Sequence, residues 1–72
     1  MESQEEKIIK AFGEKVREYR EKAGLSQSDL GAKIDSDYRK IQRIENGENA
    51  TSIVTAVEIA KVLGFSLDNI VF

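Results

Sequence analysis

Three glycines divide this chain into segments, and this punctuation limits the possible folds more than any other feature of the sequence. Gly24, Gly47 and Gly64 each follow a stretch in which apolar residues recur every three or four positions. Such spacing is typical of an amphipathic helix, and glycine is the preferred residue just after a helix ends. The chain also contains no proline, and 33% of its residues are charged. We therefore predict an all-α fold.

The size and the missing residue types exclude several classes of function. Seventy-two residues predict one domain, in which we expect residues 1–5 to be flexible. The chain has neither cysteine nor histidine, so it lacks the usual ligands of zinc and haem and the usual base of acid–base catalysis. Asp35 and Asp37 are better explained by a turn and a helix cap than by a metal site, and no residues resemble a catalytic pair. We predict no enzyme activity, no cofactor and no metal.

The distribution of charge and apolar residues bears on location. The N-terminal ten residues are charged and have no long apolar core, which is unlike a signal peptide. No apolar run approaches the roughly 20 residues that span a bilayer. We therefore expect a cytoplasmic protein without a membrane partner.

An apolar stripe and a cap mark the first two helices. The first is expected over about residues 4–23. The second is expected to begin after Ser26, because Ser26 and Asp29 can form a capping box, in which each side chain accepts a hydrogen bond from the backbone N–H of the other residue. The second helix is short and ends near Ile34. It contains Gly31, which costs about 1 kcal/mol relative to alanine, so we expect another helix to cross close by. The stripe of the first helix consists of Ile8, Phe12, Val16, Tyr19 and Ala23.

Three more helices complete the predicted bundle. The third follows Asp37, its N-cap, and ends at Asn46, with Ile41 and Ile44 facing inward. The fourth begins near Thr51 or Ser52 and ends at Leu63, and its inward residues are Ile53, Ala56, Val57, Ala60 and Leu63. A short fifth helix is capped by Ser66, and Phe65 and Ile70 form its hydrophobic staple.

The second and third helices form a candidate helix-turn-helix. Leu30, Ile34, Ile41 and Ile44 supply the apolar contacts between them, so the polar face of the third helix is left pointing outward. The net charge of the chain is −2, yet no acidic residue lies between Tyr38 and Ile44. An acidic chain has no global attraction to nucleic acid, so any DNA binding must come from a local patch such as this one.

The segment GLSQSDLGAKIDSDYRKIQRIENG resembles the lambda-repressor/Cro-like helix-turn-helix family, and the resemblance extends over residues 12–70. It implies a compact five-helix DNA-binding domain. Four positions depart from the family pattern. In the turn, Asp35 stands where glycine is usual and Ser36 stands where an apolar residue is usual. Thr51 stands in place of a proline, and Gly31 stands in place of an alanine, a change that we expect to be sterically harmless. The matching positions are Leu25, Ser26, Gln27, Leu30, Ile41, Ile44, Glu45 and Gly47.

The resemblance also implies roles for individual residues. Side chains near the start of the third helix, Tyr38 and Arg39, with Arg43 one turn later, are expected to contact base edges in the major groove. An ion pair between Arg20 and Glu45 is expected to brace that helix against the first. Phosphate or flanking contacts are expected from Gln27, Ser28, Lys40, Gln42 and Asn46.

The sequence leaves several functions open. A sequence-specific transcriptional repressor that binds a palindromic operator as a homodimer is the first. The second is an antitoxin-type module that binds a toxin partner and also autoregulates, and the third is a restriction–modification controller. The apolar residues Ile70, Val71 and Phe72 either fold back on the core or form a dimer interface.

Overall fold

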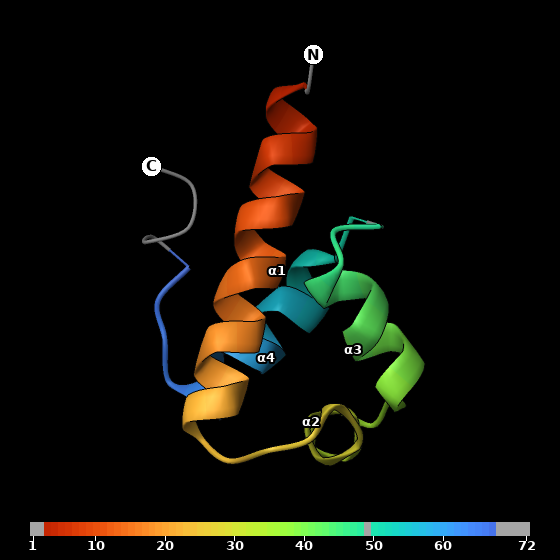
Figure 1. Cartoon of the computed structure of the whole chain (residues 1–72), viewed down its shortest axis with the longest axis vertical. Coiled ribbons are helices and arrows are strands. Elements are labelled where there is room, and N and C mark those ends of the chain that lie inside the picture. The colour runs from red at the N-terminus through yellow and green to blue at the C-terminus, as the bar shows by residue number, and fades with distance from the viewer. Residues whose placement is uncertain (1–2, 49, 68–72) are drawn as a thin grey trace.

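The computed structural model describes residues 3–48 and 50–67, which form four helices around a small core (Figure 1). They are α1 (Gln4–Lys22), α2 (Gln27–Lys33), α3 (Tyr38–Glu45) and α4 (Ile53–Leu63). The all-α architecture and the first four predicted helices are therefore confirmed. Five helices were expected, but residues 64–67 are not helical, and the rest of the predicted fifth helix, including Ile70, lies outside the described residues.

Side-chain caps explain where the short helices begin. The Ser26 hydroxyl accepts a hydrogen bond from the Asp29 N–H at 2.9 Å, and the Asp29 carboxylate accepts one from the Ser26 N–H at 2.9 Å. Asp37 accepts from the Lys40 N–H at 3.1 Å, and Ser52 caps α4 in the same way. Each cap supplies a partner for an N–H group that the first turn of a helix leaves unsatisfied.

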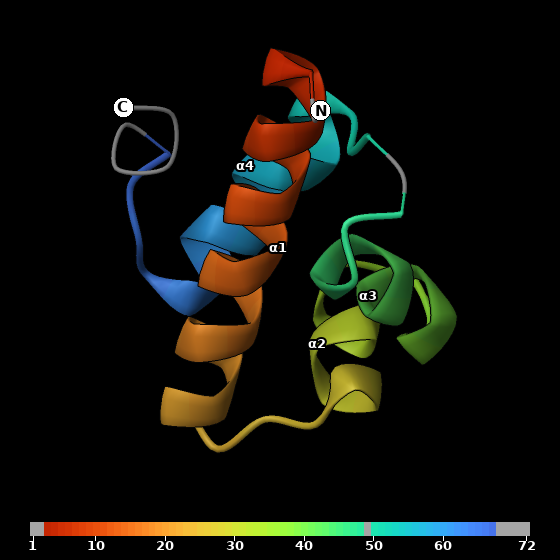
Figure 2. The ribbon, with the colours of Figure 1, turned by 45° about the horizontal axis from the view of Figure 1, so that its top comes forward.

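Helix α1 is the long axis against which the other helices pack. Helices α2 and α3 lie together on one side of α1, whereas α4 crosses behind it (Figures 1 and 2). The contacting pairs include α1 with α3, α2 with α3, and α1 with α4. Gly13 permits the close approach of α1 to α3, because a Cβ at this position would press against the backbone carbonyl oxygen of Ile44.

The core is apolar and draws on all four helices. Phe65, which follows α4, folds back on α1 and places its ring 5.1 Å from the ring centroid of Tyr19 and 6.3 Å from that of Phe12. Tyr19 is half-buried there, as expected for a core-facing residue. The buried cluster consists of Phe12, Val16, Leu30, Ile41, Ile44 and Ile59.

Two residues predicted to face inward do not. Ala23 is the C-cap of α1 rather than part of its stripe, and it is exposed. Ile53, the first residue of α4, is 73% exposed, whereas Ile59 is fully buried. Helix α4 has apolar residues on most of its circumference, so periodicity alone could not identify the buried face.

The turn between α2 and α3 contains two of the four departures from the family pattern, Asp35 and Ser36. Asp35 has a φ of 54°, the left-handed conformation for which glycine is usual. The Ser36 N–H donates to the Gly31 carbonyl at 2.7 Å and closes the turn. A Cβ at Gly31 would lie 2.8 Å from the carbonyl carbon and oxygen of Asp37. The expectation that glycine and alanine are sterically equivalent here is therefore wrong, because the backbone entering α3 occupies that space.

Candidate nucleic-acid interface

Helix α3 separates its apolar and cationic side chains onto two faces. Ile41 is 0% exposed and Ile44 is 4% exposed, and both pack into the core. Tyr38 is 45% exposed. The side chains of Arg39, Lys40, Gln42 and Arg43 are also exposed.

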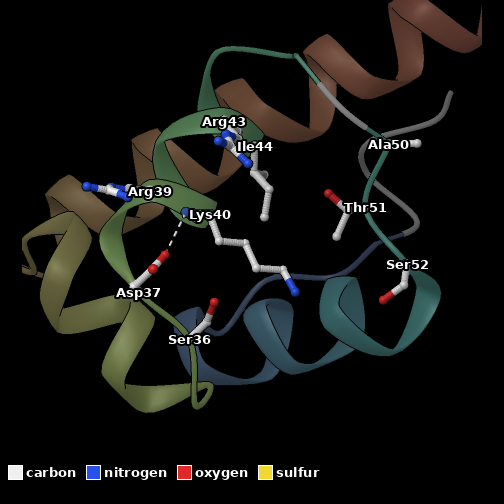
Figure 3. Close-up of a pocket in the computed structure, with 9 residues that line it drawn as sticks. All are labelled: Ser36, Asp37, Arg39, Lys40, Arg43, Ile44, Ala50, Thr51 and Ser52. Atoms are coloured by element: carbon white, nitrogen blue, oxygen red, sulfur yellow. Dashed lines mark hydrogen bonds between the residues drawn. The ribbon is translucent and has the colours of Figure 1, made fainter.

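The cationic face borders a cleft of about 640 Å³ between α3 and the start of α4. Arg39, Lys40 and Arg43 line one side, and Thr51 and Ser52 line the other. Figure 3 shows Lys40 extending across this cleft toward α4, while the guanidinium group of Arg39 points in another direction. The Lys40 ammonium group is 3.5 Å from the hydroxyl of Thr55, which is a weak contact. We call this hollow the cationic cleft.

The two arginines of this face keep their positive charge available in the part of the chain that the structure describes. Within residues 3–48 and 50–67, no carboxylate forms an ion pair with Arg39 or Arg43. The guanidinium carbon of Arg39 lies 5.9 Å from the ring centroid of Tyr38. That stacking restricts the Arg39 side chain but leaves its N–H donors available. This face can therefore donate hydrogen bonds to an anionic or acceptor-rich partner.

The end of α3 is fixed by a buried carboxylate. Arg20 donates through Nε to Glu45 Oε2 at 2.6 Å and through Nη2 to Glu45 Oε1 at 3.0 Å. The Glu45 side chain is 0% exposed and that of Arg20 is 11% exposed. Arg20 also donates through Nη1 to the Leu25 carbonyl at 2.8 Å. The predicted ion pair is therefore present in a bidentate geometry, and it ties α3 to α1 and to the connection before α2.

Two further residues join Glu45, and sequence reasoning did not assign them to it. Gln27 Nε2 donates to Glu45 Oε1 at 3.2 Å, and Arg17 Nε lies 3.6 Å from the same oxygen. Gln27 was expected to contact phosphate, yet its side-chain amide points to Glu45 and its ion pair with Arg20. Little in the sequence indicates this contact, because Gln27 and Glu45 lie 18 positions apart on two different helices. Arg17 occurs one turn before Arg20 on α1, which was a usable signal.

Hydrogen bonding shifts two pKa values in this region. The hydrogen bonds that Arg20 makes to Glu45 raise the pKa of the Arg20 guanidinium above its usual value, so the guanidinium keeps its charge. The hydrogen bond from the Ser26 backbone, with a second from its side chain, lowers the pKa of the Asp29 carboxyl. Asp29 therefore remains ionised at neutral pH in the first turn of α2, and negative charge is favoured at the N-terminal end of a helix.

The remaining predicted residues divide between the two helices of the motif. Ser28 is exposed in the first turn of α2, and Gln42 is exposed on α3. Asn46, the C-cap of α3, is exposed and its amide donates to Glu48 Oε2 at 3.2 Å. These three side chains are thus accessible, but they are not brought into the cationic cleft, whose lining from α3 is Arg39, Lys40, Arg43 and Ile44.

Comparison with known proteins agrees with this geometry. A sequence model of the family described as "Helix-turn-helix" matches residues 16–70, which include all of α2, α3 and α4. Among the described residues, no helix is both long enough and apolar enough to cross a membrane.

One relative is a candidate HTH-type transcriptional regulatory protein from Pyrococcus furiosus. It is 33% identical to this chain over 55 residues, which is 76% of the chain. The matched segment covers 18% of that relative. The likeness therefore concerns one segment of a much longer protein.

Proposed function

We propose that this chain, which belongs to the lambda-repressor/Cro-like helix-turn-helix family of DNA-binding regulatory proteins, is a sequence-specific transcriptional repressor that binds double-stranded DNA as a homodimer. One observation carries the proposal. The outward face of α3 bears two arginines that form no ion pair with any described residue, while its inward face is held by the core and by the Arg20–Glu45 ion pair, which we call the brace. A helix fixed in this way can enter the major groove without changing its orientation.

We assign base recognition to three residues on the outward face. Tyr38 and Arg39 form the first turn of α3, and Arg43 follows one turn later. An arginine pairs with O6 and N7 of guanine through two hydrogen bonds, and such a pair discriminates against other bases by about 1–3 kcal/mol. Tyr38 is suited to a thymine methyl group or to a phosphate, because it combines an apolar ring with a hydroxyl.

We assign phosphate or flanking contacts to residues around this face. Lys40 is the cation that spans the cleft, and Gln42 and Asn46 extend the exposed polar surface of α3. Ser28 and Gln27 lie in the first turn of α2. Because the Gln27 side chain donates to Glu45, we assign its DNA contact to the backbone N–H. These contacts position the protein without reading sequence.

The length of α3 supports a dimer. Its 8 residues extend about 12 Å at 1.5 Å per residue, which corresponds to only about four base steps of 3.4 Å. Such a short site recurs often in a genome. Two copies related by a two-fold axis would read two half-sites about one helical turn apart, and this would double the information in the operator.

Selection of bound genomic fragments tests this function directly. We expect the full chain to enrich fragments that contain an inverted repeat. Arg43→Ala should weaken the preference at one base pair of each half-site by about 1–3 kcal/mol. The matched control is Lys40→Ala on the same helix, which should weaken binding to all sequences equally and lower the slope of log K against log salt by about two, one for each copy in the dimer.

Two results would contradict the proposal. One is equal affinity of the wild-type chain for the enriched fragments and for random duplex at moderate salt. The other is an unchanged sequence preference in Arg43→Ala together with a reduced preference in Lys40→Ala, since this would reverse the assigned roles.

A further inference from the structure

A second hollow lies on the other side of the loop that borders the cationic cleft. It has a volume of about 510 Å³ and lies between the N-terminal half of α1 and the start of α4. Ile8, Ile9 and Phe12 line it from α1, Ile53 and Ala56 from α4, and Leu67 from the segment after α4. We call it the apolar groove.

The chemistry of the groove differs from that of the cationic cleft. Among the described residues, Glu5 is the single charged residue in its lining, and none of them adds a cation. A phosphate backbone is therefore not a suitable occupant, because it would meet an acid and no counter-charge. Apolar side chains are the suitable occupants, since burying them against this lining removes apolar surface from water.

The same face carries a projection as well as a recess. Ile53 lines the groove and is 73% exposed, and Val54, which follows it in α4 but does not line the groove, is 65% exposed. An exposed aliphatic side chain that is continuous with an apolar groove enlarges the apolar patch, and large contiguous patches mark interaction sites. A two-fold contact uses one patch on both partners, so that patch must offer both a projection and a recess.

The position of the groove relates it to the proposed DNA interface. Ala50 and Thr51 line both the apolar groove and the cationic cleft. A second copy seated in the groove would therefore lie directly beside the face that we assign to DNA. The proposed pairing of two reading helices needs a contact surface near α3, and this groove is an apolar surface adjacent to the cleft.

From these observations we infer that the apolar groove, with Ile53 in its lining and the exposed Val54 next to it in α4, is the surface through which two copies of this chain pair. Ile53 and Val54 of each copy would insert toward the groove of the other. The inference deepens the proposed function and rests on it for the requirement that two copies bind DNA together, although the pairing itself is measured without DNA.

The molecular mass of the full chain in solution tests the inference. We expect the 8.1 kDa chain to sediment as a dimer at high micromolar concentration. The double variant Ile53→Gln/Val54→Gln should raise the dimer dissociation constant at least tenfold. Both side chains are exposed, so the variant should keep the wild-type far-UV circular dichroism. The matched control is Val62→Gln, which alters a 39% exposed residue of α4 that does not line the groove, and it should leave the dimer intact.

Two outcomes of this measurement would overturn the inference. A wild-type chain that remains monomeric up to millimolar concentration would show that the groove does not pair two copies. A double variant that dimerises as tightly as the wild type would place the pairing surface elsewhere.

A DNA titration separates failure of this inference from failure of the proposed function. On a duplex with both half-sites, the double variant should lose at least tenfold in affinity, whereas on a duplex with one half-site it should match the wild type. An equal loss on both duplexes would overturn the pairing role. If the wild type prefers no sequence, the proposed function fails, and the sedimentation result still decides whether the groove pairs two copies.

Discussion

The two faces of helix α3 differ in how their polar groups are satisfied. On the inward face, the carboxylate of Glu45 is fully buried and receives hydrogen bonds from Arg20 and Gln27. On the outward face, Arg39 and Arg43 have no carboxylate partner among the described residues. A buried charge requires partners because water cannot reach it, whereas an exposed cation can remain solvated until a ligand binds.

This difference separates stability from recognition on a single helix of 8 residues. Changes to the inward face should alter the free energy of unfolding, and changes to the outward face should alter DNA binding alone. The turn before α3 affects both stability and recognition, because it sets the orientation of α3 relative to α2. The predictions below test this separation, beginning with the largest expected effect.

Removal of the buried carboxylate should have the largest effect. Glu45→Ala leaves the Arg20 guanidinium, which is 11% exposed, without its partner, and such a loss costs about 3–5 kcal/mol of unfolding free energy. Urea denaturation followed by circular dichroism measures it. The control is Glu18→Ala, which removes an exposed ion pair with Lys22 on α1 and should cost less than about 0.5 kcal/mol. Similar losses in both variants would contradict the account of the brace.

Addition of one carbon to α2 should have the next largest effect. Gly31→Ala places a Cβ against the backbone of Asp37, and overpacking of this kind costs about 1–3 kcal/mol. The sign is diagnostic, because helix propensity alone predicts a gain of about 0.5–1 kcal/mol for the same change. Ala32→Gly, at the exposed neighbouring position, should show the ordinary propensity loss. A stabilised Gly31→Ala variant would show that α3 can move away from α2 without cost.

The smallest effect is expected at the left-handed residue of the turn. Asp35→Gly removes a side chain from a position with φ 54° and should stabilise the fold by roughly 0.5 kcal/mol, because the relieved strain slightly exceeds the entropy cost of glycine. Asp35→Ala should be destabilising, since alanine lacks the side-chain oxygen with which aspartate tolerates this conformation. A Gly variant less stable than the wild type would show that the Asp35 side chain itself holds the turn.

Local chemistry made much of this fold predictable from the sequence. The capping box of Ser26 and Asp29 and the cap at Asp37 act within three residues, so their effect on helix starts could be read directly. The Arg20–Glu45 pair connects residues 25 apart, and only the family resemblance indicated it. Contacts without such a precedent were missed, as with the Gln27 amide on Glu45 and the backbone of Asp37 against Gly31.

The buried face of α4 could not be predicted for a different reason. Ile53, Val54, Val57, Ile59 and Val62 give this helix apolar residues in several directions, so hydrophobic spacing permits more than one buried face. Packing against α1 selects Ile59 and leaves Ile53 at the surface. That choice depends on the relative positions of two helices, which periodicity does not encode. The resulting exposed Ile53 is the starting point of the pairing surface inferred above.

The most direct test of the central claim is an equilibrium titration with the Arg39→Ala/Arg43→Ala double variant. The selected operator and a scrambled duplex are titrated at one salt concentration with this variant and with the wild type, and urea denaturation is measured in parallel. The account predicts that the preference for the operator falls at least tenfold, while the unfolding free energy stays within about 0.5 kcal/mol of the wild type. An unchanged preference for the operator would contradict recognition of DNA by the outward face of α3.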